Sequence, residues 1–242
     1  MESNRPVATS WHELATPQGV MWLYRAVPQG AQPQRAIVVL QEAFGVNAHI
    51  QDVTNRAAAA GYVAVAPQLF HRTGTDTVEY SDHPAAMELI GALGREEIAS
   101  DITAVCDHLA SADGIALPQI GLMGFCFGGR AAITAATALP GLGATAAFYG
   151  PGVAAGQHAV LDRFGEVTGP VLHLSGDEDP TIPAEHLDAI RAAGQAAGKD
   201  VRIEVFPGAG HAFHCDARPA MYRAEQAQKA WGLAMDLFAS SL

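Results

Sequence analysis

Short apolar runs rich in Val, Ile and Ala alternate along this chain with longer segments of helical periodicity. Such alternation is typical of a mainly parallel sheet with helices on both faces, and no other feature limits the fold as strongly. The predicted strands are residues 11–15, 20–27, 36–41, 62–67, 120–125, 144–150, 170–176 and 201–206, the first two joined as a hairpin by the sequence TPQG. The predicted helices are residues 47–60, 83–110, 129–138, 183–197 and 219–240.

Length and charge narrow the class of protein. The 242 residues, 49% of them apolar, are enough for one large core, and a single α/β domain over residues 1–242 is predicted. Acidic residues outnumber Lys and Arg by 25 to 14 with no basic run, which argues against nucleic acid or an anionic membrane surface as partner. No signal peptide or spanning segment is recognised, so we expect a cytoplasmic protein that is a monomer or a small homo-oligomer.

The cysteines differ in their surroundings. Cys106, Cys126 and Cys215 are odd in number, so they do not form a disulfide framework, and their spacing matches no zinc ribbon or CxxC motif. Cys106 shares a helix face with Ile102 and Leu109 and is assigned to the core. Cys126 is different, because it lies between an apolar strand and an Ala-rich helix in the sequence LMGFCFGG.

The sequence GFCFGG fits the nucleophile-elbow pattern G-x-(S/C)-x-G. In such an elbow a cramped turn projects the nucleophile, so Gly124 and Gly128 must be nearly free of side chain. The helix then begins under the nucleophile, where its free amides can stabilise a thiolate and later an oxyanion. Cys126 is therefore predicted to be a nucleophile, the alternative being a small buried hydrophobe.

Two later loops supply candidate partners for the thiol. Sites of this kind place an acid after a later strand and a histidine after the last one. Asp179 in LSGDEDPTIP and His211 in FPGAGHAFH occupy these places, with Asp177 as the competing acid. His211 is expected to take the proton of Cys126 and to protonate a leaving alkoxide, while the acid fixes the imidazole tautomer.

Five segments together resemble the dienelactone hydrolase family of cysteine-containing α/β-hydrolases. They are GFCFGG, VVLQEAFGVN, AVAPQLFHR, GDEDPTIP and GAGHAFH, and the resemblance covers about residues 11–238. It implies an α/β-hydrolase fold with an eight-stranded sheet. It further implies hydrolysis of carboxylic esters or lactones by a Cys-His-Asp triad, without a cofactor.

The resemblance also implies roles for other residues. Glu42 matches a glutamate that holds the resting cysteine and, on substrate binding, helps convert it to a thiolate. A carboxylate beside a thiol makes the thiolate costly, which is compatible with this role. The amides of Ala43 and Phe127 match an oxyanion hole. Further candidates for contact with substrate are Phe44, Arg72, Tyr149 and Phe213.

The departures from the family pattern concern charge. Members that cleave dienelactone resemble one another in gripping a substrate carboxylate with two arginines. Here residues 73–94 contain no Lys or Arg, and the position four after His211 is Cys215. The cations left to compensate are Arg72, Arg130 and Arg218. Residues 73–94, which include Tyr80, suggest a less charged cap, so neutral or activated esters are predicted to be preferred over anionic dienelactone.

Other constellations are weaker. The sequence HAFHC places His211, His214 and Cys215 within five residues, but no second ligand cluster has suitable spacing, so no metal is predicted. His214 and Cys215 are instead expected to line or support the pocket. GFCFGGR lacks the lysine of a phosphate-binding loop, and no nucleotide cofactor is predicted. The alternative function is a non-catalytic protein of the same fold that binds a ligand or senses redox state through Cys126.

Overall fold

An eight-stranded sheet organises the chain in the computed structural model, which describes residues 5–242. The strands are β1 (Val7–Thr16), β2 (Gly19–Pro28), β3 (Ala36–Leu40), β4 (Val63–Pro67), β5 (Ile120–Phe125), β6 (Ala144–Phe148), β7 (Val171–Gly176) and β8 (Val201–Phe206). Their order is β1-β2-β4-β3-β5-β6-β7-β8, with β2 antiparallel to both neighbours and the strands from β4 to β8 parallel. The predicted α/β-hydrolase architecture is confirmed.

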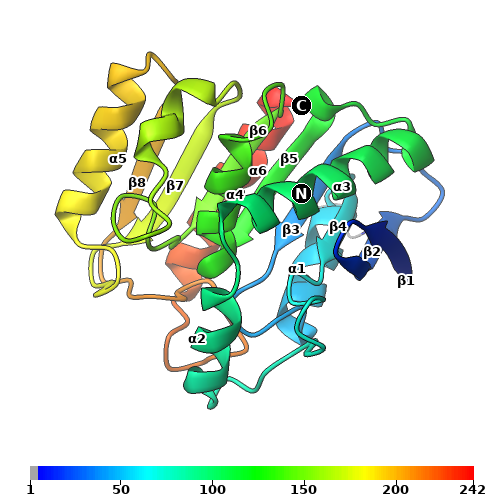
Figure 1. Ribbon diagram of the computed structural model, residues 1–242, viewed down its shortest axis with the longest axis horizontal. Helices are drawn as coiled ribbons and strands as arrows, with labels where there is room; N and C mark the ends of the chain where they lie inside the picture. Colours follow the sequence, from blue (N-terminus) through cyan, green and yellow to red (C-terminus); the bar gives the residue numbers. More distant parts are fainter. Residues whose placement is uncertain (1–4) are drawn as a thin grey trace.

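Helices cover both faces of this sheet. They are α1 (Ala48–Ala59), α2 (His83–Gly91), α3 (Arg95–Asp113), α4 (Phe127–Ala136), α5 (Ala184–Ala196) and α6 (Ala224–Ser241). α1 and α6 pack on one face, α3 and α4 on the other, and α5 lies against β8 (Figure 1). Residues of β3 alternate between the two cores, Val39 facing α1 and Val38 facing α4, because successive side chains of a strand point to opposite faces.

Local signals in the sequence place two of the connections. Thr16 and Gly19 close the β1–β2 hairpin, where the Thr16 hydroxyl donates to the Gly19 carbonyl oxygen at 2.8 Å. Gly19 has a φ of 121°, a conformation that side chains disfavour. Asn47 caps α1, its side-chain oxygen accepting from the Ile50 amide at 3.2 Å, as expected of a short polar residue at a helix start.

The single helix predicted for residues 83–110 is wrong, since α2 and α3 are separate helices. Gly94 has extended backbone and caps the start of α3, and the Glu97 carboxylate reaches back to accept from the Gly94 amide at 3.0 Å. Leu93 in the break is buried in the core beneath α3. The cap contact and this anchored leucine end one helix and start another within an apolar periodicity that continues through both.

The last helix begins later than predicted, at Ala224 rather than residue 219. The Arg223 amide donates to the Phe213 carbonyl oxygen at 2.9 Å, which holds the preceding segment as a loop against the turn after β8. On α6, Ala227, Ala234 and Phe238 are buried, whereas Ala224 at the start of the helix is exposed.

The loops that follow the parallel strands gather at one edge of the sheet. Parallel strands run in one direction, so the segments after β3, β5, β7 and β8 all emerge on the same side. Figure 1 shows the orange loop after β8 at this edge, with α2 beside it and away from the sheet. This edge therefore brings together the segments that carry the predicted site residues.

Two predictions about the whole chain have different outcomes. Within residues 5–242, no helix combines the length and the apolar character needed to cross a bilayer. The division of the chain into a single domain stays a prediction.

Candidate active site

Cys126 stands at a sharp bend between β5 and α4. Its φ of 53° and ψ of −118° lie outside the regions that residues with a side chain normally occupy. The Cys126 amide donates to the Phe148 carbonyl oxygen at 3.0 Å, which ties the bend to the end of β6. Among residues 5–242, the other non-glycine residues with positive φ are Tyr149 and Ala212. Strained backbone thus concentrates in the loops at this edge of the sheet.

The glycines on either side of Cys126 leave no room for a side chain. A Cβ on Gly124 would lie 1.9 Å from the Gly128 carbonyl oxygen, and one on Gly128 would lie 2.3 Å from the Leu40 carbonyl oxygen. Backbone atoms cannot yield as the end of a flexible side chain can. The requirement for bare positions two before and two after Cys126 is confirmed.

Replacing Gly124 by alanine should therefore lower the free energy of unfolding by about 3 kcal/mol or prevent folding, because the methyl group overlaps backbone. The matched control is Gly232→Ala in α6, where a Cβ meets nothing within 4 Å. That variant should gain up to about 1 kcal/mol from helix propensity. Denaturant unfolding measures both, and equal effects of the two substitutions would contradict the tight elbow.

Three side chains from three loops meet at Cys126. The Cys126 Sγ lies 3.0 Å from the His211 Nε2, and the His211 Nδ1 lies 2.8 Å from the Asp179 Oδ2. Cys126 comes from the β5–α4 bend, Asp179 from the loop after β7 and His211 from the loop after β8. The fold thus brings together the predicted nucleophile, base and acid, separated by 85 and 32 positions along the chain.

The two candidate acids have different partners. Asp179 is buried and contacts His211, whereas the Asp177 Oδ1 accepts from the Gly208 amide at 2.7 Å. Thr181 fixes Asp179, donating its hydroxyl at 2.6 Å and its amide at 2.9 Å to the Asp179 Oδ1. Sequence reasoning missed Thr181 as a positioning residue. An aspartate that accepts from the residue two positions on is a common turn, and the DPT sequence carried that signal.

Electrostatics favour a charged imidazole at this site. Burial by itself lowers the pKa of His211, but hydrogen bonds to Asp179 and Cys126, and their charges, raise it to about 10. Burial raises the pKa of Asp179, and the contacts with His211 and Thr181 outweigh it, leaving that pKa below its usual value. An imidazolium can therefore persist at neutral pH next to the Cys126 sulfur.

The amides of Ala43 and Phe127 are available to an oxyanion. Ala43 follows β3, and Phe127 opens α4 directly after Cys126. Within the described chain, neither amide donates to a protein acceptor. A free amide at a helix start carries partial positive charge, so this pair suits an oxygen that gains negative charge.

Glu42 is buried just after β3, and its closest ligand-type neighbours are His49 and Cys215. Its carboxylate groups with His49 and Cys215, the three donor atoms lying within 4.8 Å of one another. Burial raises the pKa of Glu42 above its usual value, while the charges of His49, Arg218 and His211 oppose the shift. The hydrogen bond of Cys126 is with His211 rather than Glu42. A role for Glu42 in tuning the Cys126 thiol stays a prediction.

Aromatic residues surround the triad. Tyr149 is fully buried, its ring centroid 5.3 Å from that of His211, and its hydroxyl has no partner within residues 5–242. The Phe213 ring packs against Tyr149 at the same centroid distance. Phe44 packs edge-on against Tyr80 at 4.8 Å. Residues 73–94 thus lie against the loop that carries Ala43, while their role as a cap over substrate stays a prediction.

The three arginines considered from the sequence have different surroundings. Arg72 is held by the Asp101 carboxylate of α3 at 2.6 and 2.8 Å and by Gln18, so its guanidinium is occupied away from Cys126. Arg130 is buried over the Phe127 ring. Arg218 lies over the rings of Phe44 and Tyr80 and forms no ion pair among the described residues.

The remaining cysteines and His214 are buried. Cys106 lies on the buried face of α3 and packs in the core, as predicted. The His214 ring lies among the rings of Phe125, Phe148 and Trp231, and burial together with nearby positive charge lowers its pKa to about 3. His214 therefore supports the site as a neutral core residue.

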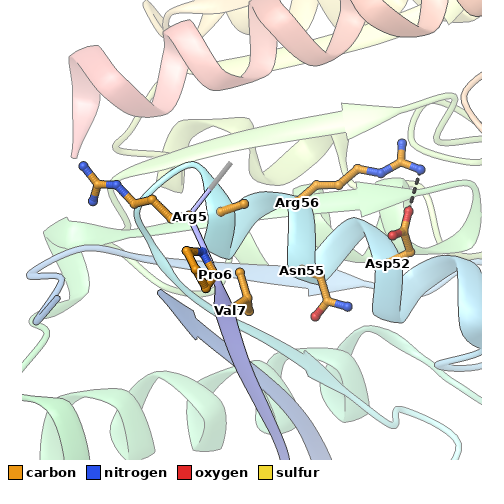
Figure 2. A pocket seen from close by; sticks show the side chains of 7 residues that line it. Arg5, Pro6, Val7, Asp52, Asn55 and Arg56 are labelled. Carbon is orange, nitrogen blue, oxygen red and sulfur yellow. Dashed lines mark ion pairs between the residues drawn. The ribbon is translucent and has the colours of Figure 1, made fainter. Parts of the chain in front are cut away.

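A shallow surface pocket of about 460 Å³ lies elsewhere, between the start of β1 and α1 (Figure 2). Its lining includes Pro6, Asn55 and Arg56. None of the residues predicted to be catalytic lines it.

Comparison with known proteins finds one family that matches most of this chain, together with similar sequences and a similar solved structure. Residues 21–242 match the profile of the Dienelactone hydrolase family. The chain is 39% identical over 223 residues to a "Putative carboxymethylenebutenolidase" of Yersinia pestis, covering 89% of this chain and 82% of that protein. It is 37% identical to a protein of the same name from Methylorubrum extorquens, covering 91% of this chain and 77% of that one. A crystal structure titled as a putative dienelactone hydrolase from Klebsiella pneumoniae superposes with a TM-score of 0.90 at 32% identity, over 97% of this chain and 99% of that one.

Proposed function

Because the chain belongs to the dienelactone hydrolase family, we propose that it hydrolyses carboxylic esters or lactones through an acyl-enzyme on Cys126. The observation that carries this proposal is the pair of contacts from Cys126 Sγ to His211 Nε2 at 3.0 Å and from His211 Nδ1 to Asp179 Oδ2 at 2.8 Å. Distances of this size allow proton transfer in both directions between sulfur and imidazole.

In the acylation step, the Cys126 sulfur attacks the substrate carbonyl carbon and forms a C–S bond. The thiol proton resides on His211 Nε2, and Asp179 holds the opposite nitrogen in its protonated form. The carbonyl oxygen gains negative charge, which the free amides of Ala43 and Phe127 stabilise. When the C–O bond breaks, the alkoxide takes the proton from His211 and leaves as an alcohol.

Deacylation uses the same base. Neutral His211 takes a proton from water, and the resulting hydroxide attacks the thioester carbonyl. The C–S bond then breaks, the acid leaves, and the sulfur recovers its proton. In this proposal Glu42, whose charge interacts with that of His211, disfavours a free thiolate at Cys126 between turnovers.

Charge near the site supports a preference for neutral or activated substrates. Arg72 is paired with buried Asp101, and Cys215 occupies the place of the second family arginine. Glu42 adds negative potential when ionised, and Arg218 partly offsets it. A substrate carboxylate would therefore enter without the two-arginine grip, and an unpaired charge is costly to desolvate.

Matched esters test this preference directly. p-Nitrophenyl butyrate and p-nitrophenyl hydrogen succinate share a leaving group and an acyl length and differ by one carboxylate. We expect kcat/KM to be at least about tenfold higher for the butyrate, and higher for p-nitrophenyl acetate than for cis-dienelactone. Preference for the anionic partner in both pairs, abolished by Arg218→Ala, would instead assign Arg218 to a substrate carboxylate and overturn the prediction.

A further inference from the structure

Three buried donor side chains converge beside the proposed triad. Glu42 follows β3, His49 lies in the first turn of α1 and Cys215 follows β8. One carboxylate oxygen, one imidazole nitrogen and one sulfur from these residues all lie within 4.8 Å of one another. Glu42 is 1% exposed, His49 4% and Cys215 0%. We propose that these three residues form a binding site for a divalent metal ion of borderline softness, for which zinc is the best fit.

Two of these three residues each have a side-chain atom that lacks any hydrogen-bond partner among the described residues. These atoms are the Glu42 Oε2 and the His49 Nε2, and both are buried. Buried polar atoms are almost always paired, because an unpaired one forfeits its hydration without compensation. Both unpaired atoms belong to neighbouring residues of types that bind metals. A metal ion would accept electron pairs from both atoms.

The surroundings of His49 are those of a metal-binding imidazole. The His49 Nδ1 donates to the Asp216 Oδ1 at 3.1 Å, which leaves the Nε2 as the ring atom that can bind a metal ion. Arg56 holds Asp216 by an ion pair and also contacts Asp52 at 2.5 Å, the contact drawn in Figure 2. A carboxylate on the far nitrogen fixes the tautomer and orientation of histidines that bind metals.

Donor chemistry selects the ion. Sulfur and nitrogen donors disfavour magnesium and calcium, which take oxygen ligands, and suit zinc. Two anionic ligands, Glu42 and the Cys215 thiolate, would cancel the charge of a dication, so the filled site is neutral despite its burial. A cysteine binds zinc as its thiolate, so metal binding releases the Cys215 thiol proton.

The size of the cluster is compatible with a tetrahedral ion after a small adjustment. Ligand atoms of tetrahedral zinc lie about 3.3–3.8 Å apart, given the usual zinc–ligand bond lengths. The largest separation here is within 4.8 Å, so side-chain movements of about 1 Å close the site. Three protein ligands leave the fourth position to water. The ion would tie the loops after β3 and β8 to α1.

Binding of metal to the purified, reduced, chelator-treated full chain tests the proposal without any assay of hydrolysis. Titration with Co²⁺ should produce a thiolate-to-cobalt charge-transfer band at one equivalent, and Zn²⁺ should displace it. Cys215→Ala should abolish the band and weaken binding at least about 100-fold. Asp216→Ala, which removes the exposed partner of His49 and also the ion pair with Arg56, should weaken binding about 10- to 100-fold.

Matched cysteine variants separate this site from the proposed catalytic thiol. Cys126→Ala and Cys106→Ala should keep the cobalt band, and Zn²⁺ should raise the melting temperature of both but not that of Cys215→Ala. Far-ultraviolet circular dichroism checks that Cys215→Ala is folded. No band in the wild type, a band that survives Cys215→Ala, or a band lost in Cys126→Ala would each overturn the metal site. The proposed hydrolysis stands or falls separately, because Cys126→Ala lacks the nucleophile.

Discussion

Cys126→Ala is expected to abolish the burst of p-nitrophenol that the wild type releases from p-nitrophenyl acetate and to lower kcat/KM at least about 10³-fold. The sulfur is the atom that forms the covalent bond, and no other thiol contacts His211 among residues 5–242. Stopped-flow absorbance measures the burst, and intact-protein mass spectrometry should detect acetylation of the wild type alone.

Cys106→Ala supplies the control for that experiment, because it removes a buried thiol in α3 that is remote from the triad. Its turnover should match that of the wild type. Turnover that survives in Cys126→Ala would contradict a cysteine acyl-enzyme. Reversible oxidation of Cys126 by peroxide in a wild type without turnover would favour the redox-sensing alternative.

Asp179→Asn is expected to lower kcat by about 10²- to 10⁴-fold, because an amide cannot hold the His211 imidazole in the tautomer that accepts the thiol proton. The paired control is Asp177→Asn. Asp177 accepts from the Gly208 amide and has no contact with His211, so its substitution should change kcat less than about tenfold. Steady-state kinetics with an activated ester distinguishes the two, and the reverse pattern would make Asp177 the acid.

A pH profile shows whether Asp179 acts through His211. The pKa of His211 is raised from 6.5 to about 10, so its contribution to stability is complete below 6.5 and is lost as the pH rises to about 10. Asp179→Asn removes part of this contribution. The loss of unfolding free energy relative to wild type should thus be larger at about pH 6 than at about pH 10. A loss independent of pH would indicate that Asp179 has only a packing role.

The features that could be predicted from the sequence are those set by residues close together along the chain. The strands, the Cys126 elbow and the cap at Asn47 depend on neighbours within a few positions, so local patterns located them. The break between α2 and α3 escaped because Leu93 is anchored by tertiary packing, while the apolar periodicity runs on across it. The order of strands and loops then indicated which distant segments share an edge.

Contacts between residues that are far apart in the sequence could not be predicted from local patterns. Arg72 was a candidate for substrate contact, but its partner Asp101 lies 29 positions further on, in α3. The HAFHC sequence gave no second ligand cluster, because Glu42 and His49 reach Cys215 only through the fold. Spacing along a chain can indicate a metal site whose ligands lie in one loop. It cannot indicate a site whose ligands come from three separate segments.

The strained bends around the triad lower the stability of the fold but hold the reacting groups in place for catalysis. Glycine in place of Ala212, with its φ of 59°, would relieve about 1–2 kcal/mol of strain. Ala212 directly follows His211, however, and a freer hinge there would let the imidazole swing away from the sulfur. Directed evolution that selects only for thermal stability would therefore favour substitutions such as Ala212→Gly. These substitutions would loosen the bends that hold the reacting groups in place, and activity would fall.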